Sequence, residues 1–310
     1  METLDQMILK IRTALVSNSF VNWGTLKQEV LAHPDKELLN TYFTSHKKNP
    51  NLEPGDRHVT HLSGVEFPMR WIPAGTFLMG AGEDDEEASN SEKPQHEVTI
   101  TQGFWMGETP VTQTQYQTIM GKNPSHFKKA GSDAPVECVS WYDVAAFANK
   151  LSALEGVSES FVGSGEDMDG VGNKGSDYVG SKGWRLPTEA EWEYACRAGT
   201  TTPRYGEVDE IAWYWDNSGR ATHPTGKKQA NAWGLYDMAG NVWEWVYDWY
   251  GTYPTQAATD PVGAATVTHR VFRGGSWFNN AYFVRAAQRS SGPPAARCYY
   301  LGFRVVRGMT

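Results

Sequence analysis

The sequence predicts one large α+β domain in which loops make up much of the mass. Thirteen Trp and 31 Gly among 310 residues are high proportions, and such chains tend to pack irregular backbone around large aromatic rings. Three capping boxes mark the starts of helices, whereas the other apolar segments are short and alternate as strands do. We therefore expect two to three helices against a small, irregular antiparallel sheet.

Residues 1–60 are expected to form a short helical extension and a linker. The stretches MILKIRTAL and WGTLKQEVLA have apolar residues at helical spacing. Residues 47–58 (KKNPNLEPGDRH) have the Pro, Gly and charge of a linker. We place a domain boundary near residue 60, with the main domain over residues 61–310.

The main domain begins with short strands. Residues 69–80 (MRWIPAGTFLMG) predict two strands around a Pro-Ala-Gly turn, and residues 96–107 (HEVTITQGFWMG) alternate like strands. Residues 83–93 are expected to be an acidic, solvated loop. Residues 162–183, rich in Gly, Asp and Ser, are expected to be a poorly ordered surface insertion. Strands are also expected at 270–273 and 303–306.

Three helices are expected to start at Thr112, Ser140 and Thr188. Each hydroxyl residue is followed three positions later by Gln, Asp or Glu, the capping-box pattern. Helices of roughly 8–15 residues should follow, and Gly199 is a suitable residue to end the third.

Charge and hydropathy exclude several classes of protein. A net charge of −8 and a pI near 5.5 argue against a nucleic-acid binder, which needs a basic face, and against docking on an anionic membrane. No apolar run approaches the ~20 residues that span a bilayer. The N-terminus lacks the features of a secretory signal. We therefore expect a cytoplasmic protein, or a cell-surface protein if a leader has been removed.

The three cysteines are too few and too scattered for a disulfide framework or a zinc site. Cys138 and Cys196 lie in apolar contexts and are expected to be buried thiols. Cys298 lies in the unusual C-terminal segment described below.

Residues 234–250 contain oxygen donors around a turn. Asp237 and Glu244 supply carboxylates, and Gly240 and Val242 can present carbonyls. Calcium takes six to eight such oxygen ligands, although the spacing is not that of an EF-hand. The alternative is a structural turn in which Glu244 pairs with an arginine.

Seven sequence blocks, taken in order, resemble the formylglycine-generating enzyme (sulfatase-modifying factor) family. They span about residues 64–306 and read WIPAGTFLMG, ETPVTQTQY, PVECVSWYDVAAFANKL, WRLPTEAEWEYACRAG, GLYDMAGNVWEW, RVFRGGSW and GFRVV. The resemblance implies the C-type lectin fold of that family's subtype. It also implies a structural calcium held by the side chains of Asp237 and Glu244 and the carbonyls of Gly240 and Val242.

The cysteine pair of that family is absent from this sequence. Family members bind copper through two cysteines, two and seven residues after the Trp of the GGSW block, where this chain has Asn279 and Val284. Because Cu(I) needs thiolates, we expect neither copper nor oxidase activity. A related iron-dependent branch needs a large His-rich helical domain. The N-terminal extension is too short for it and has only His58 and His61 close together, so iron is not expected either.

The C-terminal segment 278–300 (FNNAYFVRAAQRSSGPPAARCYY) has an unusual composition. It is rich in Tyr, Phe, Asn, Ser, Gly and Arg and contains no Lys, Glu or Asp. Such a composition is typical of paratopes, in which rings supply contact area and small polar residues adapt their hydrogen bonds. The alternative is an irregular loop packed on the core.

A second resemblance is to the variable proteins of diversity-generating retroelements, which display variable residues at this terminal position of C-type lectin folds. Their mutagenesis substitutes adenines, and an Asn codon changed in this way never encodes Lys, Glu, Gln, Met or Trp. These five types form about a fifth of this chain, so about five are expected in 278–300, yet only Gln288 occurs.

The segment divides into displayed and fixed positions. Trp277, Ala281, Arg285, Arg289, Pro294, Arg297 and Gly302 are expected to be framework, and Arg285, Arg289 and Arg304 should pair with carbonyls or acids beneath. The candidate ligand-binding, variable residues are Phe278, Asn279, Asn280, Tyr282, Phe283, Ser290, Ser291, Gly292, Pro293, Ala296, Cys298, Tyr299 and Tyr300.

We therefore expect a non-catalytic protein that binds a protein or another macromolecule through its C-terminal surface. The alternative is an enzyme or accessory factor of the formylglycine-generating and sulfoxide synthase superfamily with unrecognised chemistry.

Overall fold

A computed structural model of the chain describes residue 34 and residues 52–83, 85–170, 175–265 and 268–309. The helices expected within residues 1–50 therefore lie outside the described residues. The expected linker ends in β1 (Arg57–Leu62), which pairs with β2 (Val65–Ile72). The folded domain thus starts a few residues before the expected boundary. His58 and His61 lie on β1, where a spacing of three places them on opposite faces.

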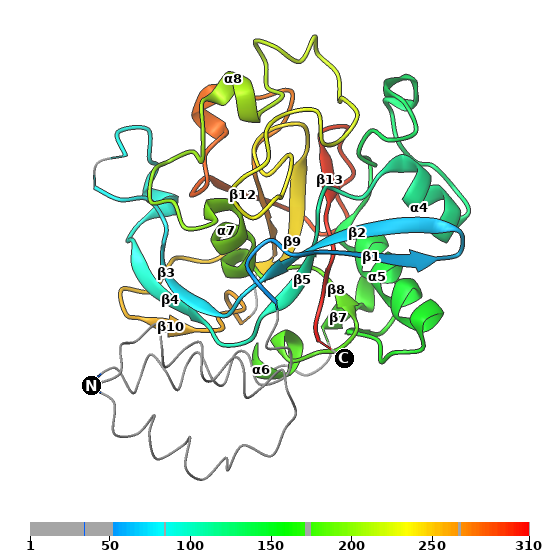
Figure 1. Cartoon of the computed structure of the whole chain (residues 1–310), viewed down its shortest axis with the longest axis horizontal. Helices are drawn as coiled ribbons and strands as arrows, with labels where there is room; N and C mark the ends of the chain where they lie inside the picture. Colours follow the sequence, from blue (N-terminus) through cyan, green and yellow to red (C-terminus); the bar gives the residue numbers. More distant parts are fainter. Residues whose placement is uncertain (1–33, 35–51, 84, 171–174, 266–267, 310) are drawn as a thin grey trace.

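The strands of the described residues form four small sheets rather than one (Figure 1). The first has the order β1–β2–β5–β14–β8, with β5 (Phe104–Gly107), β14 (Val306–Arg307) and β8 (Trp184–Arg185). The second has the order β10–β4–β3, with β10 (Ala258–Thr259), β4 (His96–Ile100) and β3 (Gly75–Met79). A short pair consists of β6 (Phe161–Val162) and β7 (Asp169–Gly170).

The remaining sheet organises the C-terminal half of the chain. Its order is β12–β11–β9–β13, with β12 (Arg289–Gly292), β11 (Arg270–Arg273), β9 (Trp243–Trp249) and β13 (Leu301–Phe303). β11 is antiparallel to both of its neighbours, whereas β13 runs parallel to β9. β10 and β4 are also parallel. The sheets are thus small and irregular as expected, but not purely antiparallel.

The three capping boxes form as the sequence predicts. They start α4 (Gln113–Met120), α5 (Trp141–Glu155) and α7 (Glu189–Arg197), and each cap hydroxyl accepts a hydrogen bond from the backbone N–H three residues later. The C-cap of α7 is Ala198, in the left-handed region, and Gly199 follows it at the C′ position as expected, with a φ of 91°. Two shorter helices, α6 (Gly175–Val179) and α8 (Val208–Ile211), complete the α-helices of the described residues.

Large aromatic residues fill the core around these helices. Trp141, Trp184, Trp192 and Trp245 are fully buried. Their indole N–H groups are satisfied; for example, Trp141 donates to the carbonyl of Val246. α4 and α5 contact the long β1–β2 hairpin, and α7 contacts β9 and β11 (Figure 1). The high Trp content therefore forms the interior of a loop-rich α+β domain, as expected.

Two expectations about loops were wrong in part, because each segment has exposed residues but also contributes buried ones. Asp85 and Glu92, within the supposedly solvated loop 83–93, are buried because both carboxylates bind Arg285. The expected insertion 162–183 also contributes to the core. Tyr178 in α6 is buried, stacks on Tyr247 with ring centroids 3.6 Å apart, and donates to the carbonyl of Leu186.

Among the described residues, no helix combines the length and apolar character that crossing a membrane would require.

Candidate functional site

The C-terminal segment leaves the four-stranded sheet at β11 and returns to it twice, as β12 and β13 (Figure 1). Gly274 and Gly275 make the first turn, with φ of 99° and 72°. A Cβ at Gly275 would lie 2.6 Å from the carbonyl oxygen of Phe283. Only glycine therefore lets the segment fold back tightly enough for its next residues to lie against the domain.

Most of the candidate variable residues reach the surface. Phe278, Asn280, Tyr282, Pro293 and Tyr299 are exposed. Asn279, Phe283, Ser290, Ser291, Ala296, Cys298 and Tyr300 are half-buried, and Gly292 is buried. By contrast, the framework residues Trp277, Arg285, Arg289 and Gly302 are buried, although Arg297 is exposed. The expected division thus largely follows solvent exposure.

Six rings form a continuous cluster, which we call the aromatic surface: Phe127, Trp215, Trp277, Phe278, Tyr299 and Tyr300. Phe278 lies at its centre, with ring centroids 5.6 Å from Trp215 and 6.3 Å from both Tyr299 and Tyr300. The buried Trp277 supports it from below, 5.4 Å from Phe278 and 5.1 Å from Phe127. Three of these rings are strongly exposed: Trp215 at 40%, Phe278 at 46% and Tyr299 at 40%.

Trp215 and Phe127 belong to this surface although the sequence did not point to them. Trp215 joins it because its backbone N–H donates to the carbonyl of Asn279 over 2.8 Å. The guanidinium of Arg220 lies over its ring at 5.0 Å. The aromatic run Trp213-Tyr214-Trp215 is a sequence signal that could have identified this segment.

The side chain of Asn279 is turned inward. Its Oδ1 accepts hydrogen bonds from the indole N–H of Trp243 over 2.8 Å and from the hydroxyl of Ser276 over 2.7 Å. Asn279 therefore fixes the loop that presents Phe278, and only part of it is available to a ligand.

Arg285 anchors the middle of the segment. Its guanidinium is buried and donates to both carboxylate oxygens of Glu92, to Asp85 and to the amide oxygen of Gln288. Its Nε donates to the carbonyl of Tyr282, and its guanidinium lies 5.1 Å from the Tyr282 ring. The exposed Tyr282 thus sits on a fully paired, buried arginine.

Arg289 and Arg304 anchor the two returning strands. Arg289 forms a bidentate pair with Glu189, with N···O distances of 2.7 and 2.6 Å. Arg304 forms a bidentate pair with Glu244 at 2.6 and 2.7 Å. Bidentate pairs of this kind fix orientation as well as charge. All three arginines expected to brace the segment therefore do so.

Six of the candidate residues lie at the two edges of the four-stranded sheet. Ser290, Ser291 and Gly292 lie on the edge strand β12, whereas Cys298, Tyr299 and Tyr300 precede β13 at the opposite edge. Three strand spacings separate the edges, roughly 14 Å. A partner that buries a standard interface spans such a distance. Gly292 contributes no side chain, and a Cβ there would lie 3.3 Å from the Phe272 ring.

The positions of the family's copper ligands show no substitute chemistry. Val284 is fully buried beside Ile211 and Tyr214, and the Asn279 amide oxygen is already hydrogen-bonded. Cys196 is buried as expected, whereas Cys138 is half-buried. The Cys138 N–H donates to the carbonyl of Cys298 over 3.0 Å. Burial raises the pKa of the Cys138 thiol to about 12, so it stays protonated at neutral pH.

The carboxylates expected to bind calcium are already hydrogen-bonded to protein groups in this structure, so their present arrangement does not suit the ion. Both carboxylate oxygens of Glu244 bind Arg304, and one also accepts from the Trp192 indole. Asp237 accepts from the Gly226 N–H and from the Asn241 amide. The arrangement matches the alternative in which Glu244 pairs with an arginine. Calcium at this loop stays a prediction, one that requires Glu244 to release Arg304.

Comparison with known proteins relates the chain to one family. Residues 65–309 match the family model described as the sulfatase-modifying factor enzyme 1-like domain. The formylglycine-generating enzyme of Streptomyces coelicolor is 32% identical over 279 residues, covering 75% of this chain and 87% of that protein. The serine/threonine-protein kinase pkn1 of Chlamydia caviae is 34% identical over 250 residues, but the chain spans only 38% of its length.

A solved structure extends the comparison to the fold. The Treponema denticola variable protein 1 superimposes with a TM-score of 0.71 at 33% sequence identity. The match covers 82% of this chain and 99% of that structure.

Proposed function

Because the chain belongs to the sulfatase-modifying factor enzyme 1-like domain family, we propose that it is a non-catalytic member that binds a macromolecule through its C-terminal surface. Its fold is the C-type lectin fold of the formylglycine-generating enzyme subtype, as expected from the sequence. The observation that carries the proposal is the aromatic surface, with three strongly exposed rings around position 279, where the enzymes of this family are expected to have the first cysteine of their pair.

The chemistry of the segment supports binding rather than catalysis. An amide at position 279 and a buried isopropyl group at 284 offer no thiolate to a soft metal ion. The same segment instead exposes Phe278, Tyr282 and Tyr299. Aromatic side chains of this type dominate protein interfaces because they bury much area at low entropic cost. We therefore infer a protein as the most favoured ligand.

The frame beneath the segment supports diversification of this surface. Tyr282 rests on Arg285, whose charge is paired underneath, and Phe278 rests on the buried Trp277, so replacing either exposed ring leaves the ion pairs intact. Surface substitutions away from such networks usually change stability by less than about 0.5 kcal/mol. Similarity to a protein named for its variability, together with the near absence of residues that adenine mutagenesis cannot produce, favours a variable protein of a diversity-generating retroelement.

The second candidate is an enzyme or accessory factor of the same superfamily. Its support is the 32% identity to a formylglycine-generating enzyme. Such a function would need chemistry outside positions 279 and 284. Stoichiometric copper or iron in the purified protein would favour this candidate and count against a purely binding role.

Sequencing the 3′ end of this gene across a population tests the proposal. Substitutions should concentrate at the exposed positions, with Phe278, Asn280, Tyr282 and Tyr299 among them. Arg285, Arg289 and Arg304 should be unchanged because each neutralises buried carboxylates. A neighbouring reverse transcriptase and a near-repeat of the 3′ end differing at adenines would support the mechanism. Substitutions spread evenly over the gene would refute it.

A further inference from the structure

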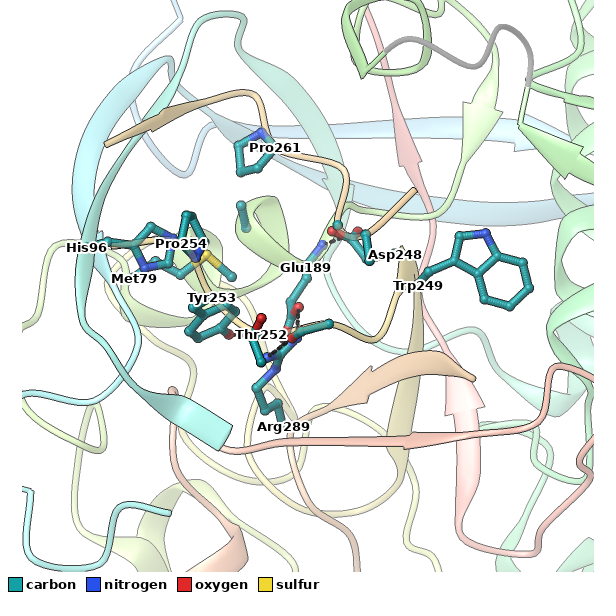
Figure 2. A pocket seen from close by; sticks show the side chains of 14 residues that line it. Met79, His96, Glu189, Asp248, Trp249, Thr252, Tyr253, Pro254, Pro261 and Arg289 are labelled. Carbon is teal, nitrogen blue, oxygen red and sulfur yellow. Dashed lines mark hydrogen bonds and ion pairs between the residues drawn. The ribbon is translucent and has the colours of Figure 1, made fainter. Parts of the chain in front are cut away.

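A pocket of about 340 Å³ opens beside the start of α7 (Figure 2). Its walls come from β3, β4, α7, the end of β9, β12 and the loop 251–264. Figure 2 shows Asp248 and the backbone of Glu189 on one side and Met79, His96 and Tyr253 on the other. The volume lies within the range of small-ligand sites. The proposed macromolecular binding does not use this pocket.

Asp248 is a buried carboxylate that lines this pocket, and only one of its oxygens accepts a hydrogen bond from a described residue. Its side chain is 2% exposed. Its Oδ2 accepts the N–H of Glu189, the first residue of α7, over 2.7 Å, and within the described part of the chain no donor is hydrogen-bonded to Oδ1. A Cβ at Gly263 would lie 3.1 Å from that Oδ1. Glycine at this position therefore leaves the space next to the oxygen open.

The other charges around the pocket are already engaged. The Glu189 carboxylate accepts from Arg289, Arg273 and the Tyr253 hydroxyl. The remaining Arg289 nitrogen donates to the carbonyls of Ser91 and Gly251. Glu189 and Arg289 therefore neutralise each other, and among the charged lining residues that the structure describes, Asp248 is the carboxylate with an oxygen open to a ligand. The rest of the lining is largely apolar, including Met79, Ala190 and Pro254.

We propose that this pocket binds a small ligand bearing an ammonium group, with Asp248 Oδ1 as the acceptor. The ammonium would supply the missing hydrogen bond and the opposite charge, while Met79, His96 and Tyr253 would contact its carbon atoms. A buried carboxylate next to a cation is stabilised in its ionised form. A neutral ligand that accepts a hydrogen bond would instead require the protonated form of Asp248. Its affinity would therefore fall as pH rises.

The surroundings fix the sign of that dependence. Burial and the carboxylate of Glu189 raise the pKa of Asp248 well above its ordinary value of 3.8, while the Glu189 N–H and Arg289 oppose the shift and Glu191 adds to it. His96 and Tyr253 face the same pocket. An alkylammonium stays charged up to about pH 10. Binding therefore strengthens as pH rises and Asp248 ionises.

The experiment is an NMR titration of the full chain with propylammonium at several pH values between 5 and 8. Propanol is the neutral comparison and propionate the anionic one. The backbone N–H of Glu189 is the reporter because it is hydrogen-bonded to Asp248. Asp248→Asn removes the charge but keeps an oxygen for that N–H. Asp133→Asn, at an exposed aspartate, is the matched control.

Wild type and Asp133→Asn should bind propylammonium saturably, more tightly as pH rises. Asp248→Asn should bind at least tenfold more weakly and without that pH dependence, and propanol should bind wild type at least tenfold more weakly. The thermal midpoint of Asp248→Asn, which should not fall below that of wild type, establishes that the variant is folded. The proposal would be overturned if wild type did not bind propylammonium, or if Asp248→Asn bound it as tightly as wild type does. Tighter binding of propionate than of propylammonium to wild type would also overturn it.

Discussion

Single buried ion pairs hold the C-terminal segment in its conformation. The pair between Glu244 and Arg304 offers a test of this role. Glu244 and Arg304 are both fully buried, so each carboxylate oxygen and each paired nitrogen has lost its water. Glu244→Gln leaves the Arg304 charge without a counter-ion. Breaking a buried pair from one side typically costs about 3–5 kcal/mol. Urea denaturation should show a loss of this size in the free energy of unfolding.

The matched control is Glu87→Gln, because Glu87 is 43% exposed. It pairs with Arg204 at 2.7 Å and lies 3.6 Å from Arg285, whose charge Asp85 and Glu92 still neutralise. Exposed pairs contribute about 0–1 kcal/mol, so this variant should be nearly as stable as wild type. Equal losses in the two variants would contradict the role given to burial. Repeating the wild-type and Glu244→Gln measurements with calcium tests the ion. A calcium-dependent rise in the wild-type midpoint, lost in the variant, would support a site; an unchanged midpoint would rule it out.

Between elements, the turn at Gly275 determines how closely the segment follows the domain. Gly275→Ala adds a methyl 2.6 Å from the carbonyl oxygen of Phe283, at a φ of 72°. Gly219→Ala has a similar φ of 60° but nothing within 4 Å of the added carbon. In the control, the free energy of unfolding should fall only by what an alanine in the left-handed region costs, about 1–2 kcal/mol. Gly275→Ala should lose a further 1–3 kcal/mol from the clash, measured by urea denaturation. Equal losses would show that the contact with Phe283 is unimportant.

The elements predicted correctly from the sequence are those whose signal is local. A capping box places the donor and acceptor three residues apart, so Thr112, Ser140 and Thr188 identify their helices without reference to the rest of the chain. The loop 83–93 was misjudged for the opposite reason. Asp85 and Glu92 are buried by Arg285, 200 and 193 residues away, and composition alone describes an acidic run as solvated.

At the scale of the whole molecule, the candidate site was predicted in part. The segment 278–300 and its bracing arginines were identified because they are contiguous or follow a family pattern. Trp215 and Phe127 were missed because only the tertiary fold brings their segments to Phe278. The pocket at Asp248 was missed for the same reason: its lining comes from six separate parts of the chain. Sequence patterns report neighbours along the chain, whereas both surfaces are assembled across it.

Two buried carboxylates give the whole molecule opposite responses to pH. Burial raises the pKa of Glu193, but Arg197 and Arg273 outweigh it, and the pKa falls below its ordinary 4.5. Glu193 therefore stabilises the fold above about pH 4.5, and this contribution is lost as pH falls through its lowered pKa. Asp248, whose pKa is raised, binds its proton more tightly when folded. Its contribution is complete below pH 3.8 and is lost as pH rises toward the raised pKa.

Stability should therefore be greatest at mildly acidic pH, and Asp248→Asn should remove the decline on the neutral side. The free energy of unfolding of wild type and variant, measured from pH 4 to 8, gives the test. The variant should become increasingly more stable than wild type as pH rises from about 4, by at most about 1.4 kcal/mol per pH unit. The difference should level off once Asp248 ionises in the folded protein. If the free energies of unfolding of wild type and variant instead changed with pH by the same amount, Asp248 would have the same pKa in the folded and unfolded chains. That result would remove the electrostatic reason for a cation in its pocket.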